Sequence, residues 1–341
     1  MVTGNEGYVG SCLVPELQGR GHEVVGVDAG LLAGCGTGEE IPPADVQLRA
    51  DIRDLEPVAL AGVEAVIHLA GISNDPHGDL DPAVTAEVNA AATARLARLC
   101  QSEGVSRFVL ASSCSVYGAA GDAWLDETSP TGPVTAYARS KLEAEEAVLA
   151  MADAGFAPTA LRCATAFGPS PRLRGDLVLN NLVGHAVATG RVLLKSTGVS
   201  WRPMVHVRDI ATAFAEVLDA PTVAVGGEVF NVGSTAANHR VRELADLVAE
   251  LHPAADIAVR GDASADARSY RVNCDKLATQ VPGATPRVTL RDGVVELISH
   301  LEHLDLDAAA LEGPRYQRLA HVRRGQAAGR IDRDLRVRPA G

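Results

Sequence analysis

Thr3-Gly4-Asn5-Glu6-Gly7-Tyr8-Val9-Gly10 is a glycine-rich segment typical of the first turn of a dinucleotide-binding βαβ unit. Its glycines recur every third residue, after a short apolar start and before a run that reads as a helix. Glycine permits a tight turn and lets the backbone approach a diphosphate without a Cβ clash. A helix that begins here points its first N–H groups at the phosphates. The pattern predicts dinucleotide contacts at Gly4, Gly7, Tyr8, Val9 and Gly10.

An acid follows the next expected strand. Asp28 comes directly after Glu23–Val27, about 20 residues beyond the loop, where a carboxylate binds the ribose diol of an adenosine. A 2′-phosphate would be repelled there, so we expect NAD rather than NADP as the cofactor. Only Met1-Val2-Thr3 precede the loop, although a βαβ unit needs a strand of about five residues. Either this strand is unusually short, or the start is truncated relative to a longer protein.

Short β-rich runs alternate with amphipathic helical runs through the first half of the chain. Strands are expected at Glu23–Val27, Ala65–Leu69, Arg107–Ala111 and Pro158–Arg162, with a helix over Ala83–Glu103. This alternation predicts an α/β fold with a doubly wound parallel sheet of the Rossmann type. The strands are continuously apolar, as in a sheet that helices cover on both faces.

The pattern loosens after Gly168, where helices are expected at Leu177–Thr189, Arg208–Asp219 and Val241–Leu251 and a short strand at Phe230–Gly233. No long linker or repeat separates this half from the first, so we expect a smaller α/β lobe interwoven with the Rossmann domain. The expected division assigns residues 1–167 and about 205–225 to the NAD-binding domain, and 168–204 with 226–341 to a substrate-binding lobe and C-terminal helices.

Composition narrows the range of partners. The formal net charge of −12 over 341 residues argues against nonspecific binding of nucleic acid. No run approaches the roughly 18 apolar residues of a membrane helix, and no signal peptide is visible. We therefore expect a cytoplasmic protein without a membrane partner. Arg315–Arg338 holds eight arginines, which indicates a solvated helix end or a basic face for an acidic partner or a phosphorylated ligand.

The cysteines and histidines give no sign of a metal. None of the six cysteines forms a CxxC pair, and the ten histidines show no metal-binding spacing. We expect reduced, mostly buried cysteines and no metal site.

Tyr137 and Lys141 are the strongest candidates for chemistry. They lie four residues apart where a helix is expected, so both side chains share one face. A phenol releases its proton near pH 10, and a fixed ammonium nearby favours the phenolate and lowers that pKa. The pair is a candidate acid/base for a sugar or alcohol hydroxyl. The alternative is an ordinary pair on an exposed helix.

Taken in order, these motifs resemble the extended short-chain dehydrogenase/reductase family, in its group of NAD-dependent nucleotide-sugar epimerases and dehydratases. The resemblance runs from Thr3 to about Leu297. The matching segments are Thr3–Gly10 (TGxxGxxG), Asp51–Asp54 (an adenine-binding acidic motif), His68–Gly71 (HLAA), Asn89 (a helix Asn that supports the cofactor site), Ala111–Gly118 (the strand with the catalytic Ser or Thr), Tyr137–Lys141 (YxxxK) and Arg202–Asp209 (RxxxHVxD).

The resemblance implies roles for individual residues. Ser113 takes the catalytic Ser/Thr position beside Tyr137, while Lys141 lowers the Tyr137 pKa and holds the nicotinamide ribose. Further cofactor contacts are implied at Asp51, Ile52, Leu69, Ala70, Gly71 and Asn89. Substrate contacts are implied at Ser113, Ser115, Asn181 and Arg202, the last two at the diphosphate of a nucleotide sugar.

One departure from the family concerns a late arginine. Many members carry Arg three residues before an Asp, whereas Ala263 stands three residues before Asp266 here. Arg268 or Arg271 is the candidate replacement, and we assign Arg268 to the substrate site.

Residues 114 and 115 discriminate among the family's reactions. The related 4,6-dehydratases carry Asp-Glu before VYG and the decarboxylases carry Glu, whereas this chain has Cys114-Ser115. An epimerase acting through a transient keto sugar is therefore ranked first. A sugar dehydrogenase or reductase, an atypical dehydratase and a non-catalytic NAD-binding protein remain as alternatives. Cys114 is either an acid/base with a depressed pKa or a packed small residue.

The resemblance also implies a homodimer. Helices at about Ala83–Glu103 and Ser140–Ala154 usually pair between subunits in this family. Small residues around Ala90–Ala92 and Glu145–Ala147 would permit close packing of these helices.

Overall fold

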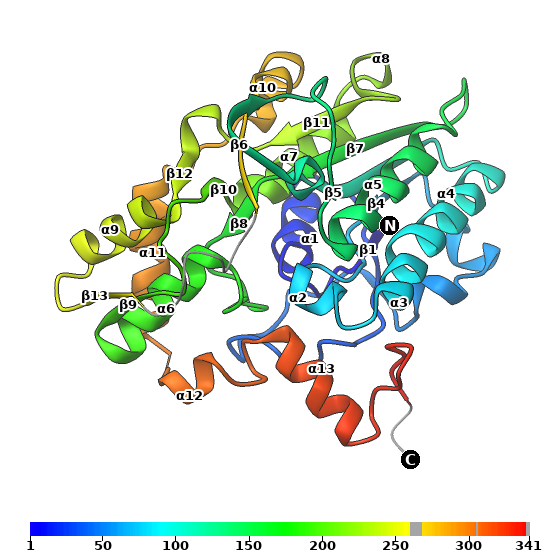
Figure 1. Ribbon diagram of the computed structural model, residues 1–341. Helices are drawn as coiled ribbons and strands as arrows, with labels where there is room; N and C mark the ends of the chain where they lie inside the picture. The colour runs from blue at the N-terminus through cyan, green and yellow to red at the C-terminus, as the bar shows by residue number, and fades with distance from the viewer. Residues whose placement is uncertain (260–267, 305, 339–341) are drawn as a thin grey trace.

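The computed structural model describes residues 1–259, 268–304 and 306–338. A seven-stranded sheet runs through its centre in the order β11-β7-β5-β4-β1-β2-β3, with every neighbouring pair parallel. The α/β fold with a parallel Rossmann-type sheet is confirmed (Figure 1). Its strands are β1 (Val2–Thr3), β2 (Val25–Val27), β3 (Val46–Leu48), β4 (Ala65–His68), β5 (Arg107–Ser113), β7 (Ala157–Cys163) and β11 (Val229–Val232).

Helices cover both faces of this sheet because its strands are apolar on both sides. On one face, α1 (Gly10–Gly19) packs against α7 (Val207–Asp219) through residues such as Leu13 and Phe214. On the other face, α4 (Ala92–Ser102) and α5 (Ala136–Leu149) bury residues such as Leu96 and Val148. A parallel sheet needs such double cover, because each crossover lays a helix on one face.

The remaining elements form the smaller lobe and the connections to it (Figure 1). Three small sheets pair β8 (Thr165–Phe167) and β12 (Asn238–Arg240) with β10 (Trp201–His206), β9 (Arg191–Leu194) with β13 (Asp256–Val259), and β6 (Ala119–Leu125) with β14 (Ser269–Val272). The helices are α2 (Asp75–Gly78), α3 (Pro82–Ala86), α6 (Val178–Thr189), α8 (Thr222–Val225), α9 (Val241–Leu251), α10 (Asp275–Gln280), α11 (Leu290–Glu302), α12 (Ala308–Leu311) and α13 (Arg318–Ala327).

The strand expected at Phe230–Gly233 belongs to the large sheet and not to the smaller lobe. It forms β11, which pairs in parallel with β7 at the edge of the large sheet. The expected division had put residues 226–341 with the substrate-binding lobe. The reason for the difference is that α7 lies against the large sheet, so the chain leaving α7 returns to the nearest open edge of that sheet.

The first strand is two residues long but is paired on both sides. Val2 lies opposite Gly26 of β2 and Ile67 of β4, so β1 holds a central place in the sheet. The helix expected over Ala83–Glu103 is present as α3 and α4, joined by a widened helical turn at Glu87–Ala91. No helix of the described ranges is long and apolar enough to cross a membrane.

A buried ion pair fastens α5 to the sheet. Arg162 of β7 donates from Nε to both carboxylate oxygens of Glu145 at 3.1 Å, and both residues are nearly inaccessible to solvent. The Arg162 guanidinium also donates to the Tyr117 hydroxyl at 3.0 Å and lies 5.1 Å from the centre of that ring. Because α5 also carries Tyr137 and Lys141, this pair fixes their position relative to the strands.

Glu145→Ala should lower the free energy of unfolding by about 3–5 kcal/mol, since it leaves the Arg162 cation buried without a carboxylate. Urea denaturation followed by circular dichroism measures the effect. Glu146→Ala, which changes an exposed residue one position along α5, should fall within about 0.5 kcal/mol of the wild type. Equal losses in the two variants would contradict the anchoring role.

Candidate active site

The carboxyl edge of the large sheet forms the floor of a cavity of about 670 Å³ that extends to the smaller lobe. Strands β1, β4, β5 and β7 all end at this edge because they run parallel. The cavity brings together all but two of the site residues expected from the sequence. Those that line it are Gly4, Gly7, Tyr8, Val9, Gly10, Asp28, Asp51, Ile52, Leu69, Ala70, Gly71, Ser113, Ser115, Tyr137, Lys141, Asn181, Arg202 and Arg268.

The glycine loop approaches the neighbouring backbone so closely that a side chain at Gly4 or Gly10 would clash with it. Gly4 has a φ of +71°, and a Cβ on it would lie 2.8 Å from the backbone nitrogen of Ala70. A Cβ on Gly10 would lie 2.3 Å from the Gly4 carbonyl oxygen. The loop therefore closes tightly against the end of β4 and exposes the first turn of α1. This bare backbone at a helix N-terminus fits the diphosphate of a dinucleotide.

The two acids of the cofactor half occupy different settings. Asp28 follows β2, lines the cavity and accepts a hydrogen bond from the Gly30 amide at 2.8 Å. Burial is the largest influence on the Asp28 pKa, which is raised. Asp51 accepts from the Arg53 backbone at 2.9 Å and pairs with its guanidinium at 2.7 Å. Asp28 is thus the less neutralised of the two and suits a ribose diol.

Asn89 is one of the two expected residues that do not line the cavity. It is 1% exposed and lies in the widened helical turn. Its Oδ1 accepts from the Ile72 amide at 2.8 Å, while its Nδ2 donates to the Ile72 carbonyl at 2.9 Å and to Ser140 Oγ at 3.0 Å. Asn89 therefore ties the loop after β4 to α5, and acts on the cavity only through that loop.

Cys114 is the other exception, and its candidate role as an acid/base needs correction. Its side chain is fully buried and its thiol donates to the Arg162 carbonyl at 3.1 Å, away from the cavity. Burial raises the Cys114 pKa well above its ordinary value. Strand β5 ends at Ser113 and the chain continues as a single 3-10 helical turn over Cys114–Tyr117. This turn leaves Ser113 and Ser115 at the cavity while Cys114 packs into the core. Cys114 is a packed small residue.

Ser113, Tyr137 and Lys141 converge on one wall of the cavity. Burial raises the Tyr137 pKa to about 12, against the opposing effects of a hydrogen bond from Ser113 and the charge of Arg174. Lys141 is not among the main influences on that pKa, contrary to expectation. Its ammonium instead donates to the Ala111 carbonyl at 2.9 Å, and burial lowers its own pKa to about 8.

The Ser115 hydroxyl is buried at the cavity and has no hydrogen-bond partner among the described residues. Buried hydroxyls are rarely left unpaired, so this one is available to a ligand. On the lobe side, Asn181 donates to the Gly175 carbonyl at 2.8 Å and Arg202 donates to the Arg268 carbonyl at 2.6 Å. Arg268 forms an ion pair with Asp75 of α2 across the cavity.

Arg271, the other candidate replacement for the missing arginine, lies elsewhere. Its guanidinium is 4.7 Å from the Trp124 ring centre and 4.9 Å from that of Trp201. It does not line the cavity, unlike Arg268. Ala263 and Asp266, on which that comparison rested, lie outside the described residues.

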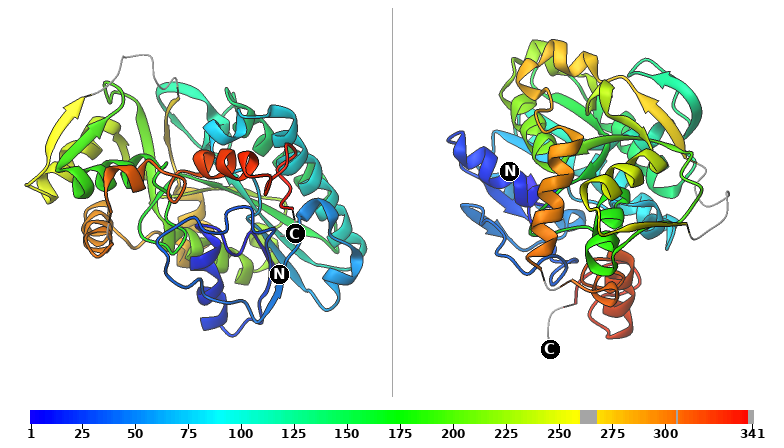
Figure 2. Two further views of the ribbon diagram at one scale, coloured as in Figure 1. Left: turned by 90° about the horizontal axis from the view of Figure 1, so that it is seen from below. Right: turned by 90° about the vertical axis from the view of Figure 1, so that its left-hand side faces the viewer.

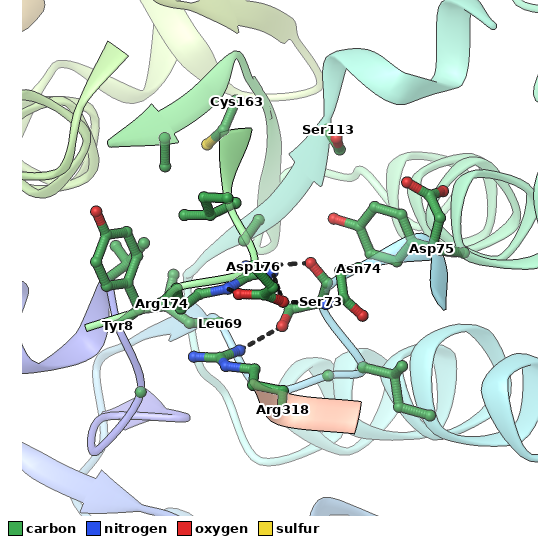
Figure 3. A pocket seen from close by; sticks show the side chains of 18 of the residues that line it. Tyr8, Leu69, Ser73, Asn74, Asp75, Ser113, Cys163, Arg174, Asp176 and Arg318 are labelled. Carbon is green, nitrogen blue, oxygen red and sulfur yellow. Dashed lines mark hydrogen bonds and ion pairs between the residues drawn. The ribbon is translucent and has the colours of Figure 1, made fainter. Parts of the chain in front are cut away.

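A group of charged residues that the sequence motifs do not indicate lies in the middle of the cavity (Figure 3). Arg174 donates to both carboxylate oxygens of Asp176, at 3.0 and 2.9 Å. Arg318 reaches the same place from α13 and donates to Ser73 Oγ. The signals were the charges of Arg174 and Asp176 in the loop after β8, and the run of C-terminal arginines. Neither showed which side chains turn inward, because that depends on how distant segments pack.

The fold and the site define a dinucleotide-dependent enzyme with a Ser–Tyr–Lys set. Residues 1–233 match the model of the "NAD dependent epimerase/dehydratase family". A UDP-glucose 4-epimerase of Mycolicibacterium smegmatis is 30% identical over 87% of this chain and 96% of its own length. UDP-glucuronic acid decarboxylase 1 of Arabidopsis thaliana is 27% identical over 88% of this chain and 68% of its own length.

Among solved structures, MoeE5 in complex with UDP-glucuronic acid and NAD aligns with a TM-score of 0.76 and 30% identity, over 87% of this chain and 97% of that one. The chain belongs to the NAD-dependent epimerase/dehydratase family, and its cofactor is NAD.

The buried ammonium of Lys141 yields a stability prediction. The folded-state pKa of about 8 lies below the ordinary 10.5, so the folded state holds the proton less tightly than the unfolded state. The resulting cost is fully present below pH 8 and disappears as the pH rises to about 10.5. Lys141→Met, freed of nucleotide, should be about 2 kcal/mol more stable than the wild type at pH 7, after allowance for the lost bond to Ala111.

Urea denaturation at pH 7 and at pH 10 measures this difference, which should shrink at the higher pH. Arg139→Met is the control, since it removes a cation on the exposed face of α5. A Lys141→Met variant less stable than the wild type at pH 7 would contradict the depressed pKa.

Proposed function

We propose that this protein is an NAD-dependent nucleotide-sugar epimerase that acts through a transient keto sugar. The observation that carries the proposal is the combination on the end of β5: Ser113 joins Tyr137 and Lys141 at the cavity, while Cys114 and Ser115 offer no carboxylate to it. Epimerisation, which only removes and returns hydrogen at one carbon, needs Ser113, Tyr137 and Lys141 alone. Eliminating water needs an additional acid and base.

The other carboxylates near the centre of the cavity are engaged by arginines. Asp176 is paired with Arg174, and Asp75 with Arg268. Pairing with a cation holds a carboxyl group in its ionised form, so it is a weak proton donor at neutral pH. This disfavours the atypical dehydratase and leaves the sugar dehydrogenase or reductase as the second candidate, since that reaction uses the same three residues.

Each residue of the set has a distinct task in this proposal. Bound NAD supplies the acceptor and donor of hydride. Tyr137 accepts the proton of the sugar hydroxyl as its phenolate when hydride leaves the sugar, and returns that proton when hydride comes back. Ser113 positions the sugar oxygen by a hydrogen bond, and its hydrogen bond to Tyr137 favours the phenolate. Lys141 lines the cavity, with its ammonium held by the Ala111 carbonyl, and binds the nicotinamide ribose. The unpaired Ser115 hydroxyl orients a second hydroxyl of the sugar.

The relatives' names favour a uridine diphosphate sugar as the substrate, so the first test is a panel of UDP-sugars incubated with the protein in deuterated water. Proton NMR should detect inversion at one sugar carbon without deuterium at its neighbours. Deuterium next to the reacting carbon, with loss of water, would instead identify a dehydratase. Net formation of NADH, followed at 340 nm, would identify a dehydrogenase.

Tyr137→Phe should reduce turnover by about 10²- to 10⁴-fold, because the proton exchange loses its acid/base. NAD binding should stay nearly intact, because the ring remains in place. Tyr316→Phe is the control, since Tyr316 is a buried tyrosine that does not line the cavity. Turnover is measured by the NMR assay. Undiminished turnover in Tyr137→Phe would refute the mechanism.

We propose further that two copies pair through α4 and α5, which lie side by side on one face of the sheet. Ala92 and Glu145, expected at such an interface, are buried within the subunit instead. The outward faces carry Ala91 and Arg98 on one stretch and Glu143 on the other, so opposite charges are available across a two-fold axis. Light scattering during size-exclusion chromatography should give twice the mass of the chain. A monomer at micromolar concentration would refute the dimer.

A further inference from the structure

The C-terminal segment, residues 314–338, crosses the cofactor half of the cavity. It lies beyond the residues 1–233 that the family model covers. Figure 1 shows α13 beside α2 and α3, and the left view of Figure 2 shows it running across the molecule between the lobe and the large-sheet domain. The segment is therefore placed to form an outer wall of the site.

Specific contacts hold the segment there. The Gly36 amide donates to the Arg315 carbonyl at 2.8 Å, and Arg53 donates to the Asp334 carbonyl at 2.8 Å. Leu335 packs with Ile72 and lines the cavity. These anchors lie in the loops after β2, β3 and β4, which surround the cofactor half of the site. The interpretation of this arginine-rich run as a solvated helix end is therefore incomplete.

Arg318, the first residue of α13, points into the cavity (Figure 3). It is 7% exposed and donates to the Ser73 hydroxyl. Among the described residues it has no carboxylate within ion-pairing distance, whereas neighbouring Arg174 is neutralised by Asp176. The cluster thus holds two buried guanidinium groups and one carboxylate, which pairs with Arg174, so it keeps an unbalanced positive charge.

The surroundings of this charge indicate which part of a ligand it meets. Burial and then the charge of Arg174 lower the Arg318 pKa to about 10, so the side chain is still a cation at neutral pH. Arg318 lines the same cavity as Asp28 and the glycine loop, and it donates to Ser73 in the loop after β4. The excess charge therefore lies in the cofactor half of the cavity, together with the ribose-binding acid and the glycine loop. In a dinucleotide, the diphosphate binds at the glycine loop, next to the adenosine ribose.

We propose that Arg318 binds the diphosphate of NAD, so that the C-terminal segment closes the cofactor half of the cavity over the bound dinucleotide. A guanidinium presents a planar pair of donors that matches two phosphate oxygens. The anion offsets a charge that the protein alone leaves unbalanced, and the segment gains a contact only when NAD is bound. NAD is then retained between turnovers, as an enzyme that returns its hydride to the same substrate requires.

Arg318→Gln tests the proposal through binding alone, so its outcome is separate from that of the proposed reaction. Isothermal titration of nucleotide-free protein should give about 10- to 100-fold weaker binding of ADP-ribose, which carries the diphosphate. Adenosine, which lacks it, should bind as to the wild type. The Arg318→Gln protein should also retain less NAD through purification. Arg323→Gln, an exposed arginine of the same helix, should match the wild type in all three measurements.

Titration with UDP shows which diphosphate Arg318 contacts, that of NAD or that of the sugar nucleotide. Weaker UDP binding with unchanged ADP-ribose binding would overturn the proposal, and so would unchanged affinity for both ligands. If Arg318→Gln fails to fold by circular dichroism, Arg318→Lys takes its place, keeping the charge but not the paired donors. A loss of ADP-ribose affinity smaller than about threefold in a folded Arg318→Lys variant would then count against the proposal.

Discussion

The parallel direction of the seven central strands is the constraint on which the site depends. Parallel strands all end at one edge, so the segments that follow β1, β4, β5 and β7 meet there although they are far apart in sequence. The glycine loop follows β1, Leu69 to Gly71 follow β4, and Ser113 ends β5. Without this common edge the same residues would not form a cavity, which is the general reason that ligands bind at the carboxyl ends of such sheets.

The residues that the proposed chemistry needs reduce the stability of the structure around them. Tyr137 and Lys141 both sit where burial disfavours their charged forms, and the pKa values of both move away from their ordinary values. The Glu145–Arg162 ion pair offsets this loss of stability by fixing α5 to β7. Asn89 secures the loop after β4 to the same helix through Ser140. The helix α5, which carries buried charge, is thus held from two sides, by β7 and by the loop after β4. Active sites commonly reduce the stability of a protein in this way.

Arginine–carboxylate pairs set the character of the cavity's interior. Arg174 with Asp176 and Arg268 with Asp75 neutralise the two acids nearest its centre, which favours hydride and proton exchange over elimination. Arg318 differs from these arginines, because no carboxylate of the described residues pairs with its charge. That imbalance connects a C-terminal segment outside the matched family region to the cofactor. It gives the proposed epimerase a physical means of keeping NAD in place while the keto sugar is present.

Local spacing and chemistry confined to a few residues were enough to predict the parallel sheet, the glycine loop, Asp28 and the order of the Ser–Tyr–Lys motifs. For the same reason, most of the site residues expected from the sequence line the cavity. Tertiary packing alone turns Cys114 into the core, adds β11 to the large sheet and brings Arg174, Asp176 and Arg318 together. These outcomes depend on how the chain turns after β5 and on contacts between segments far apart in the sequence, such as Arg174 and Arg318, which are more than 140 positions apart. Local sequence patterns do not predict such contacts.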